Sequence, residues 1–228
     1  MTKLLIMLSL VVLATVPVTT SALDKTEVPE VTVEGLRLVP GTNDIAYVWA
    51  VPGISLSQYK HVYLLEPAVA FRQNWKRDQN RGSPSGLRVT VNDMDRIRAG
   101  VKELFLDVFT KELEAGGYSL ANERAEDVLI VRPAILNLDV NAPDIQRAGA
   151  RASMATSAGS MTLYMELIDS ESDFLLAKAM DPTSDRESHM LQWQTGAANR
   201  QAARLLMEPW AKALRNVLDE ARNVTGQE

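Results

Sequence analysis

Apolar residues recur at helical spacing in two long segments of the chain. In residues 92–115 they fall three or four positions apart, at Met94, Ile97, Val101, Leu104, Phe105, Val108 and Leu113. Residues 196–223 repeat the spacing, at Ala202, Leu206, Trp210, Leu214, Val217, Leu218 and Ala221. This spacing places the apolar side chains on one helix face, so both segments are predicted to be helices that pack on a shared core. Asn92 is expected to cap the first helix, and Pro209 to kink or restart the second.

Four further segments have the residue pattern of strands. They are residues 60–71, 127–140, 161–168 and 174–181, which are rich in strand-forming residues or alternate between apolar and polar positions. Pro67 interrupts the first, and because proline cannot donate a backbone hydrogen bond, it predicts an edge position or a bulge. Together these elements predict an α/β protein of the α+β type. We expect a mainly antiparallel sheet with two long helices packed on one face.

The acidic loop DSESD, residues 169–173, connects the last two predicted strands. Two strands joined by five polar residues predict an antiparallel hairpin, in which Asp and Ser side chains accept hydrogen bonds from backbone N–H groups of the turn. A calcium site is the alternative, because calcium takes carboxylate ligands. The loop lacks the central glycine and terminal glutamate of the twelve-residue calcium loop. We therefore favour the turn and predict no metal site.

The first 22 residues have the features of an export signal. Lys3 gives a basic start, residues 4–16 are almost wholly apolar, and Pro17 is followed by small residues up to Ala22. This run of roughly 13 residues is shorter than the ~20 that a spanning helix needs. We predict a signal peptide over residues 1–22, with a retained membrane anchor as the alternative, a flexible leader over 23–33 and a single domain over 34–224. The protein is expected to be exported to the periplasm or cell envelope.

Composition removes several classes of function. The 24 basic and 29 acidic residues give a net charge of −5, which creates no general attraction to nucleic acid. The chain has no cysteine, so a thiolate nucleophile, a cysteine zinc site and a lipid anchor on cysteine are all excluded. With the signal segment removed, no transmembrane anchor is predicted. We expect the partner to be another envelope protein or an envelope component.

A basic segment, residues 72–88, is the best candidate for a contact surface. Its cations outnumber its single acid, Asp78, and its glycine-rich end predicts a loop. Trp75 is the candidate for an exposed contact residue, since aromatic and arginine side chains dominate binding hot spots. The predicted binding residues, for an anionic partner such as a phosphate-bearing lipid head or an acidic protein face, are Arg72, Trp75, Lys76, Arg77 and Arg81. The alternative, which we favour, is a solvated loop without function.

The sequence contains no recognisable catalytic motif. It lacks a nucleophile elbow, a phosphate-binding P-loop and a zinc-protease motif, and its only histidines are His61 and His189. No catalytic residue and no cofactor is therefore predicted, and the protein is expected to be non-enzymatic. The alternative is an unrecognised periplasmic hydrolase that uses His189 as a base with Asp181 or Asp185, because these acids precede it in DPTSDRESH.

The order of several motifs resembles the bacterial domain-of-unknown-function family 3313 (DUF3313), whose members are envelope proteins often predicted to be lipoproteins. The matching pieces are Gly35-Leu36 with Pro40-Gly41, YVWAVPGISLSQYKHVYLLEPAVAF, ELFLDVFTKELEAGGYSL, MELIDSESDFLLAKAMD and PWAKALRNVLDEA. They cover most of residues 35–222, and the order is more specific than any one piece. The resemblance implies an envelope location and a compact α/β domain, and it supplies no catalytic residues. This chain departs from many members in having no cysteine after the signal peptide.

Overall fold

The computed structural model describes residues 28–40, 45–81, 88–140, 154–155, 159–184, 192–193 and 196–225. Over these residues the protein is α+β, with a mixed sheet and three helices. The strands are β1 (Arg37–Leu38), β2 (Tyr47–Ala50), β3 (His61–Leu64), β4 (Ala68–Phe71), β5 (Ser119–Leu120), β6 (Val128–Val140), β7 (Met154–Ala155), β8 (Gly159–Asp169), β9 (Leu175–Ser184) and β10 (Gln192–Trp193). The helices are α1 (Trp75–Gln79), α2 (Val91–Ala115) and α3 (Gly196–Thr225).

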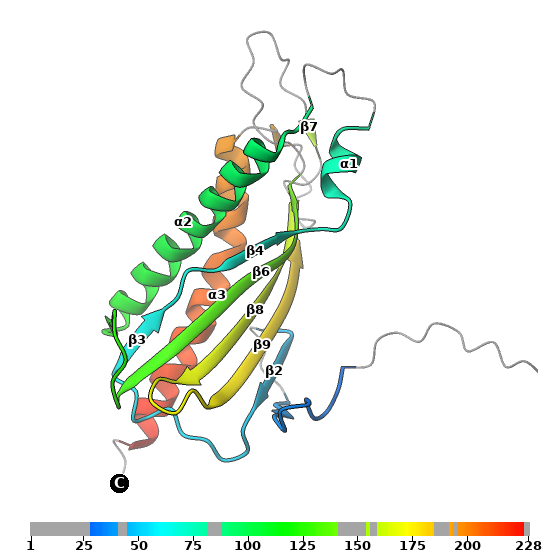
Figure 1. The fold of residues 1–228 in the computed structure, drawn as a ribbon. Helices are drawn as coiled ribbons and strands as arrows, with labels where there is room; N and C mark the ends of the chain where they lie inside the picture. Colours follow the sequence, from blue (N-terminus) through cyan, green and yellow to red (C-terminus); the bar gives the residue numbers. More distant parts are fainter. Residues whose placement is uncertain are drawn as a thin grey trace, which may run out of the picture.

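The main sheet has the strand order β1-β2-β9-β8-β6-β3-β5, and β4 also pairs with β6 (Figure 1). From β1 through β2, β9 and β8 to β6, each strand is antiparallel to the next, whereas β3 and β4 run parallel to β6, and β5 runs parallel to β3. The sheet is therefore mixed, and the prediction of a mainly antiparallel sheet was wrong. The reason is α2, because a helix between β4 and β6 is the crossover that brings the chain back parallel.

Two prolines explain why the predicted strand 60–71 divides into β3 and β4. Strand β6 pairs with β3 up to Val131 and with β4 from Ala134. The carbonyl of Val131 accepts a hydrogen bond from Leu65 at 3.0 Å. Because backbone groups alternate sides along a strand, the nitrogen of Pro133 points to that same side. Pro133 and Pro67 both lack a backbone N–H, and both lie at the break between β3 and β4, where no donor is needed.

The two long helices lie side by side on one face of the sheet (Figure 1). Their apolar faces and the inner face of the sheet form one core, in which Phe105 is fully buried and Val101 and Leu214 are 8% and 6% exposed. The residue that caps α2 is Thr90, and Asn92 lies inside the helix. The Thr90 hydroxyl accepts from the Asp93 N–H at 3.2 Å, while the Asp93 carboxylate accepts from the Thr90 N–H at 2.8 Å, which is a capping box.

Helix α3 runs through Pro209 as one element, so of the two predicted outcomes the restart does not occur, and the kink stays a prediction. The next two residues, Trp210 and Ala211, are buried at 2% and 0% exposure, so tertiary packing stabilises the helix directly after the proline.

The hairpin predicted around the acidic loop is present, since β8 and β9 pair antiparallel from Ser160 to Ile168. Asp169 Oδ1 accepts hydrogen bonds from the Ser172 N–H at 2.9 Å and from its hydroxyl at 2.6 Å. Asp169 Oδ2 accepts from the Tyr59 hydroxyl at 2.8 Å. Arg124 forms an ion pair with Asp173 at 2.7 Å. The acids of this loop therefore hold the turn and attach it to the rest of the domain.

Candidate binding surface

The segment predicted as a basic loop begins with a short helix. Helix α1 packs on the end of the sheet through Trp75, whose ring is stacked on Phe71 with 4.4 Å between ring centroids. The Trp75 indole N–H donates to the carbonyl of Val140 at 3.2 Å, and the residue is only 1% exposed. The prediction that Trp75 is an exposed contact residue was therefore wrong. Trp75 fixes the position of the surrounding cations and does not itself face a partner.

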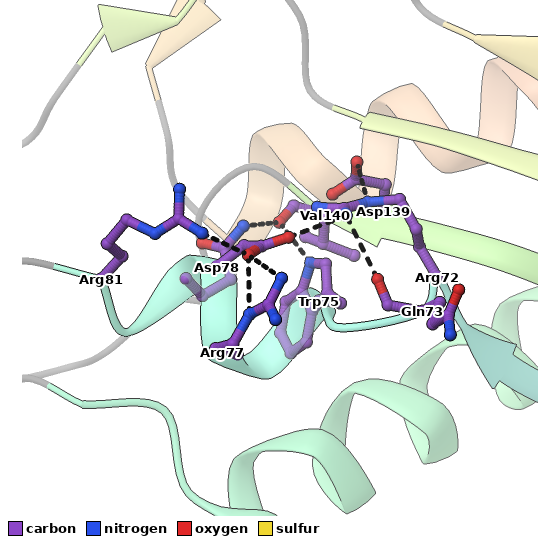
Figure 2. A network of polar contacts seen from close by, with 9 residues as sticks. Arg72, Gln73, Trp75, Arg77, Asp78, Arg81, Asp139 and Val140 are labelled. Atoms are coloured by element: carbon purple, nitrogen blue, oxygen red, sulfur yellow. Dashed lines mark hydrogen bonds and ion pairs between the residues drawn. The ribbon is translucent and has the colours of Figure 1, made fainter.

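Asp78 organises the arginines of this segment (Figure 2). Its carboxylate accepts from Arg72 Nη1 at 3.0 Å and lies 3.3 Å from Nη2 of both Arg77 and Arg81. The hydrogen bond from Arg72 is the largest cause that lowers the pKa of Asp78, with Arg77 and Arg81 adding to it. Arg72 also donates to Asp139 through Nε at 2.8 Å. The structure thus brings together three of the predicted residues, and Arg72 is committed to two carboxylates.

The cations Lys76, Arg77 and Arg98 line a shallow depression of about 420 Å³. Phe71 and Met94 also line it. Arg98 lies 5.1 Å above the Phe71 ring and pairs with Asp95 at 2.7 Å. The side chains of Arg77 and Arg81 are 66% and 75% exposed. We call Lys76, Arg77, Arg81 and Arg98 the cationic surface.

The cationic surface carries excess positive charge on an acidic protein. With Arg72 it has five cations, against the three carboxylates of Asp78, Asp95 and Asp139, so its net charge is +2 while the whole chain has −5. Sequence reasoning missed Arg98 and Asp139. Arg98 lies on α2 and Asp139 is 67 residues from Arg72, and no local pattern links such distant positions.

The residues of the alternative hydrolase are only partly described. His189 and Asp185 lie outside the described residues. Asp181 is described, and both of its oxygens are used in the fold: Oδ1 accepts from the Ala46 N–H at 2.9 Å and Oδ2 from the Trp210 indole at 2.6 Å. Asp181 therefore joins the start of β2 to α3. The other histidine, His61, is on β3 with Nε2 3.5 Å from Asp127, and both side chains are well exposed.

Within the part of the chain that the structure describes, no group of three His, Asp or Glu residues is placed to hold a metal ion. No helix among the same residues combines the length and apolar character needed to cross a membrane.

The fold and its cationic surface define a small α+β protein without recognisable catalytic machinery in its described residues. The chain belongs to the family described as Protein of unknown function (DUF3313), whose family model matches residues 36–214. The resemblance expected from the order of motifs is thus confirmed. Among curated proteins, no significant match to the sequence is found.

Several solved structures are similar to this chain at low identity. The PelC dodecamer from Paraburkholderia phytofirmans is 12% identical, covers 74% of this chain and 98% of its own, and has a TM-score of 0.33. A putative neuraminyllactose-binding hemagglutinin homolog from Helicobacter pylori is 13% identical over 78% of this chain and 97% of its own, with a TM-score of 0.36. A protein from Xanthomonas campestris matched to DUF330 is 13% identical over 75% and 93%, also at 0.36. At these TM-scores the likeness carries no argument about function.

Proposed function

We propose that this protein is an exported, non-enzymatic component of the cell envelope that binds an anionic partner through the cationic surface. The observation that carries the proposal is the way α1 is held. Trp75, the first residue of α1, is buried, and Asp78 forms ion pairs with Arg72, Arg77 and Arg81. A flexible basic loop would lose conformational entropy when it bound a partner, and a preorganised segment avoids much of that loss.

The charge distribution supports an anionic partner. Arg77 and Arg81 share one carboxylate at 3.3 Å, so each keeps donors that are free to bind a further acceptor. Arginine forms bidentate hydrogen bonds with carboxylate and phosphate groups, which matches an acidic protein face or a phosphate-bearing headgroup. The export signal predicted over residues 1–22 supports a partner in the envelope.

The test is photo-cross-linking in intact cells from a photoreactive amino acid at position 77. Arg77 is the best position because its side chain is 66% exposed and lines the depression. The expected result is a discrete adduct that disappears when Lys76→Glu and Arg81→Glu are added, because reversed charges repel an anionic partner.

The matched control places the same photoreactive group at Lys111, which is 67% exposed on α2 and lies outside the cationic surface. This position should give no such adduct. The proposal is wrong if position 77 gives no adduct, or gives only adducts that position 111 also gives. It is also wrong if the adduct survives the charge reversal.

A further inference from the structure

A second concave feature lies between the N-terminal halves of α2 and α3. It is a cleft of about 240 Å³, closed on its third side by the end of β6 and the start of β8. Its walls are mostly apolar, and the apolar side chains that line it include Ile97, Val101, Leu104, Leu138, Met161 and Leu206. It is separate from the cationic surface, with which it shares no lining residue.

Gly100 is the most informative residue in this cleft. It lies in the interior of α2, where glycine is the least favourable residue after proline. Its backbone is ordinary helix, and a Cβ added there would meet no atom of the described residues within 4 Å. Neither backbone conformation nor packing among the described residues therefore requires glycine at this position. A bare stretch of helix backbone leaves room for something outside the chain to approach closely.

The charges around the mouth of the cleft are unevenly compensated. The Asp93 carboxylate accepts from the Thr90 N–H at 2.8 Å and also pairs with Arg96. Asp139 accepts from Arg72 at 2.8 Å. Arg200 is exposed, lines the same cleft and forms no ion pair with any residue that the structure describes. The unmatched charge at the rim is thus one cation, and an occupant should bring one negative charge to an otherwise apolar site.

We infer that this cleft binds a medium-chain fatty acid, with the aliphatic tail between α2 and α3 and the carboxylate at Arg200. An apolar protein cavity of about 150 Å³ accommodates benzene, so by proportion about 240 Å³ accommodates roughly ten carbon atoms. Arg72 contributes by pairing with Asp139, because the unpaired Asp139 carboxylate would repel the carboxylate of the ligand. The inference goes beyond the proposed function and does not depend on it.

The experiment is isothermal titration of the purified protein with decanoate, with butyrate as the short-chain comparison. The intact cleft should bind decanoate, and butyrate should bind too weakly to measure because it has little apolar surface to bury. Gly100→Leu, whose side chain enters the cleft, should weaken decanoate binding at least tenfold. Ala99→Leu is the matched control, since Ala99 is exposed one residue away on the same helix and does not line the cleft.

The carboxylate is tested with Arg200→Gln and with decanol as a neutral ligand. The substitution should weaken decanoate binding about tenfold, the effect of losing one charge-assisted hydrogen bond, and leave decanol binding unchanged. Absence of decanoate binding by the folded protein would overturn the inference, as would equal effects of Gly100→Leu and Ala99→Leu. A protein that is dimeric in sedimentation and becomes monomeric with Gly100→Leu would also overturn it, because a second copy would then occupy the cleft. Charge reversal at Lys76 and Arg81 should leave decanoate binding intact, which separates this inference from the proposed function.

Discussion

Replacing Trp75 by alanine should destabilise the protein strongly, because this side chain fixes α1 to the sheet. A tryptophan buries about 150–250 Å², and at about 25 cal/mol per Å² its transfer from water contributes roughly 4–6 kcal/mol. The Val140 carbonyl retains a donor after the substitution, because Gln79 Nε2 also donates to it at 3.3 Å. The expected loss is therefore that of a large core truncation, about 3–5 kcal/mol.

Trp75→Phe separates burial from hydrogen bonding. A phenyl ring can retain the stacking on Phe71, and the loss should fall to about 1–2 kcal/mol for the missing hydrogen bond and the reduced volume. The assay is urea unfolding followed by far-ultraviolet circular dichroism, which does not rely on the fluorescence of the removed tryptophan. An exposed contact residue would change stability by less than about 0.5 kcal/mol. A loss below about 1 kcal/mol for Trp75→Ala would refute the burial of this ring.

Three further substitutions test other parts of the structure. Gly100→Ala should raise the free energy of unfolding by about 0.5–1 kcal/mol, because alanine is the better helix former and its Cβ meets open space; a decrease in thermal stability would contradict this. Asp181→Ala should lower it by about 2 kcal/mol through loss of the hydrogen bonds to Ala46 and Trp210, and an unchanged urea midpoint would remove that structural role. Hydrogen bonds from the Ser172 hydroxyl and N–H lower the pKa of Asp169, and Tyr59 lowers it further. The ionised Asp169 carboxylate therefore stabilises the folded protein fully above the unfolded-state pKa near 3.9, and this stabilisation is lost as pH falls through the folded-state pKa. With Asp169→Asn, the free energy of unfolding from urea titrations should fall less steeply below about pH 4 than in the unmodified protein. An equally steep fall would show that ionised Asp169 does not contribute to the pH dependence of stability.

The elements with regular periodicity were predictable from sequence. Seven apolar residues at helical spacing identify α2, and the alternation from Met161 to Leu167 identifies β8, because both patterns are created by burial of one face. The cap of α2 was placed two residues late, since Thr90 and Asn92 are both good caps. What decides between them is the reciprocal bond of Asp93, which a single-residue preference does not capture.

Features of the fold that depend on contacts between residues far apart in the sequence could not be predicted from local sequence patterns. The parallel pairing of β3 and β4 with β6 follows from the path of α2 across the sheet. Trp75 stands among polar residues, and Phe71, the apolar residue four positions before it, belongs to the predicted strand 60–71, so the sequence surroundings of Trp75 indicated exposure. The carbonyl that it reaches belongs to Val140, 65 residues away. The same holds for the cationic surface, where Arg98 of α2 joins the basic segment only through tertiary packing.

The central claim is that positive charge on the cationic surface attaches this protein to the envelope. The most direct measurement is the fraction of protein that remains with isolated envelopes as sodium chloride is raised, because attraction between exposed charges is screened within about 10 Å at 0.1 M salt. The variant Lys76→Glu, Arg77→Glu, Arg81→Glu should be released at low salt, while the control Lys60→Glu, Lys111→Glu, Lys212→Glu, with the same change in net charge, should be retained like the unmodified protein. Equal release of the two variants, or retention of the unmodified protein that does not respond to salt, would contradict the account.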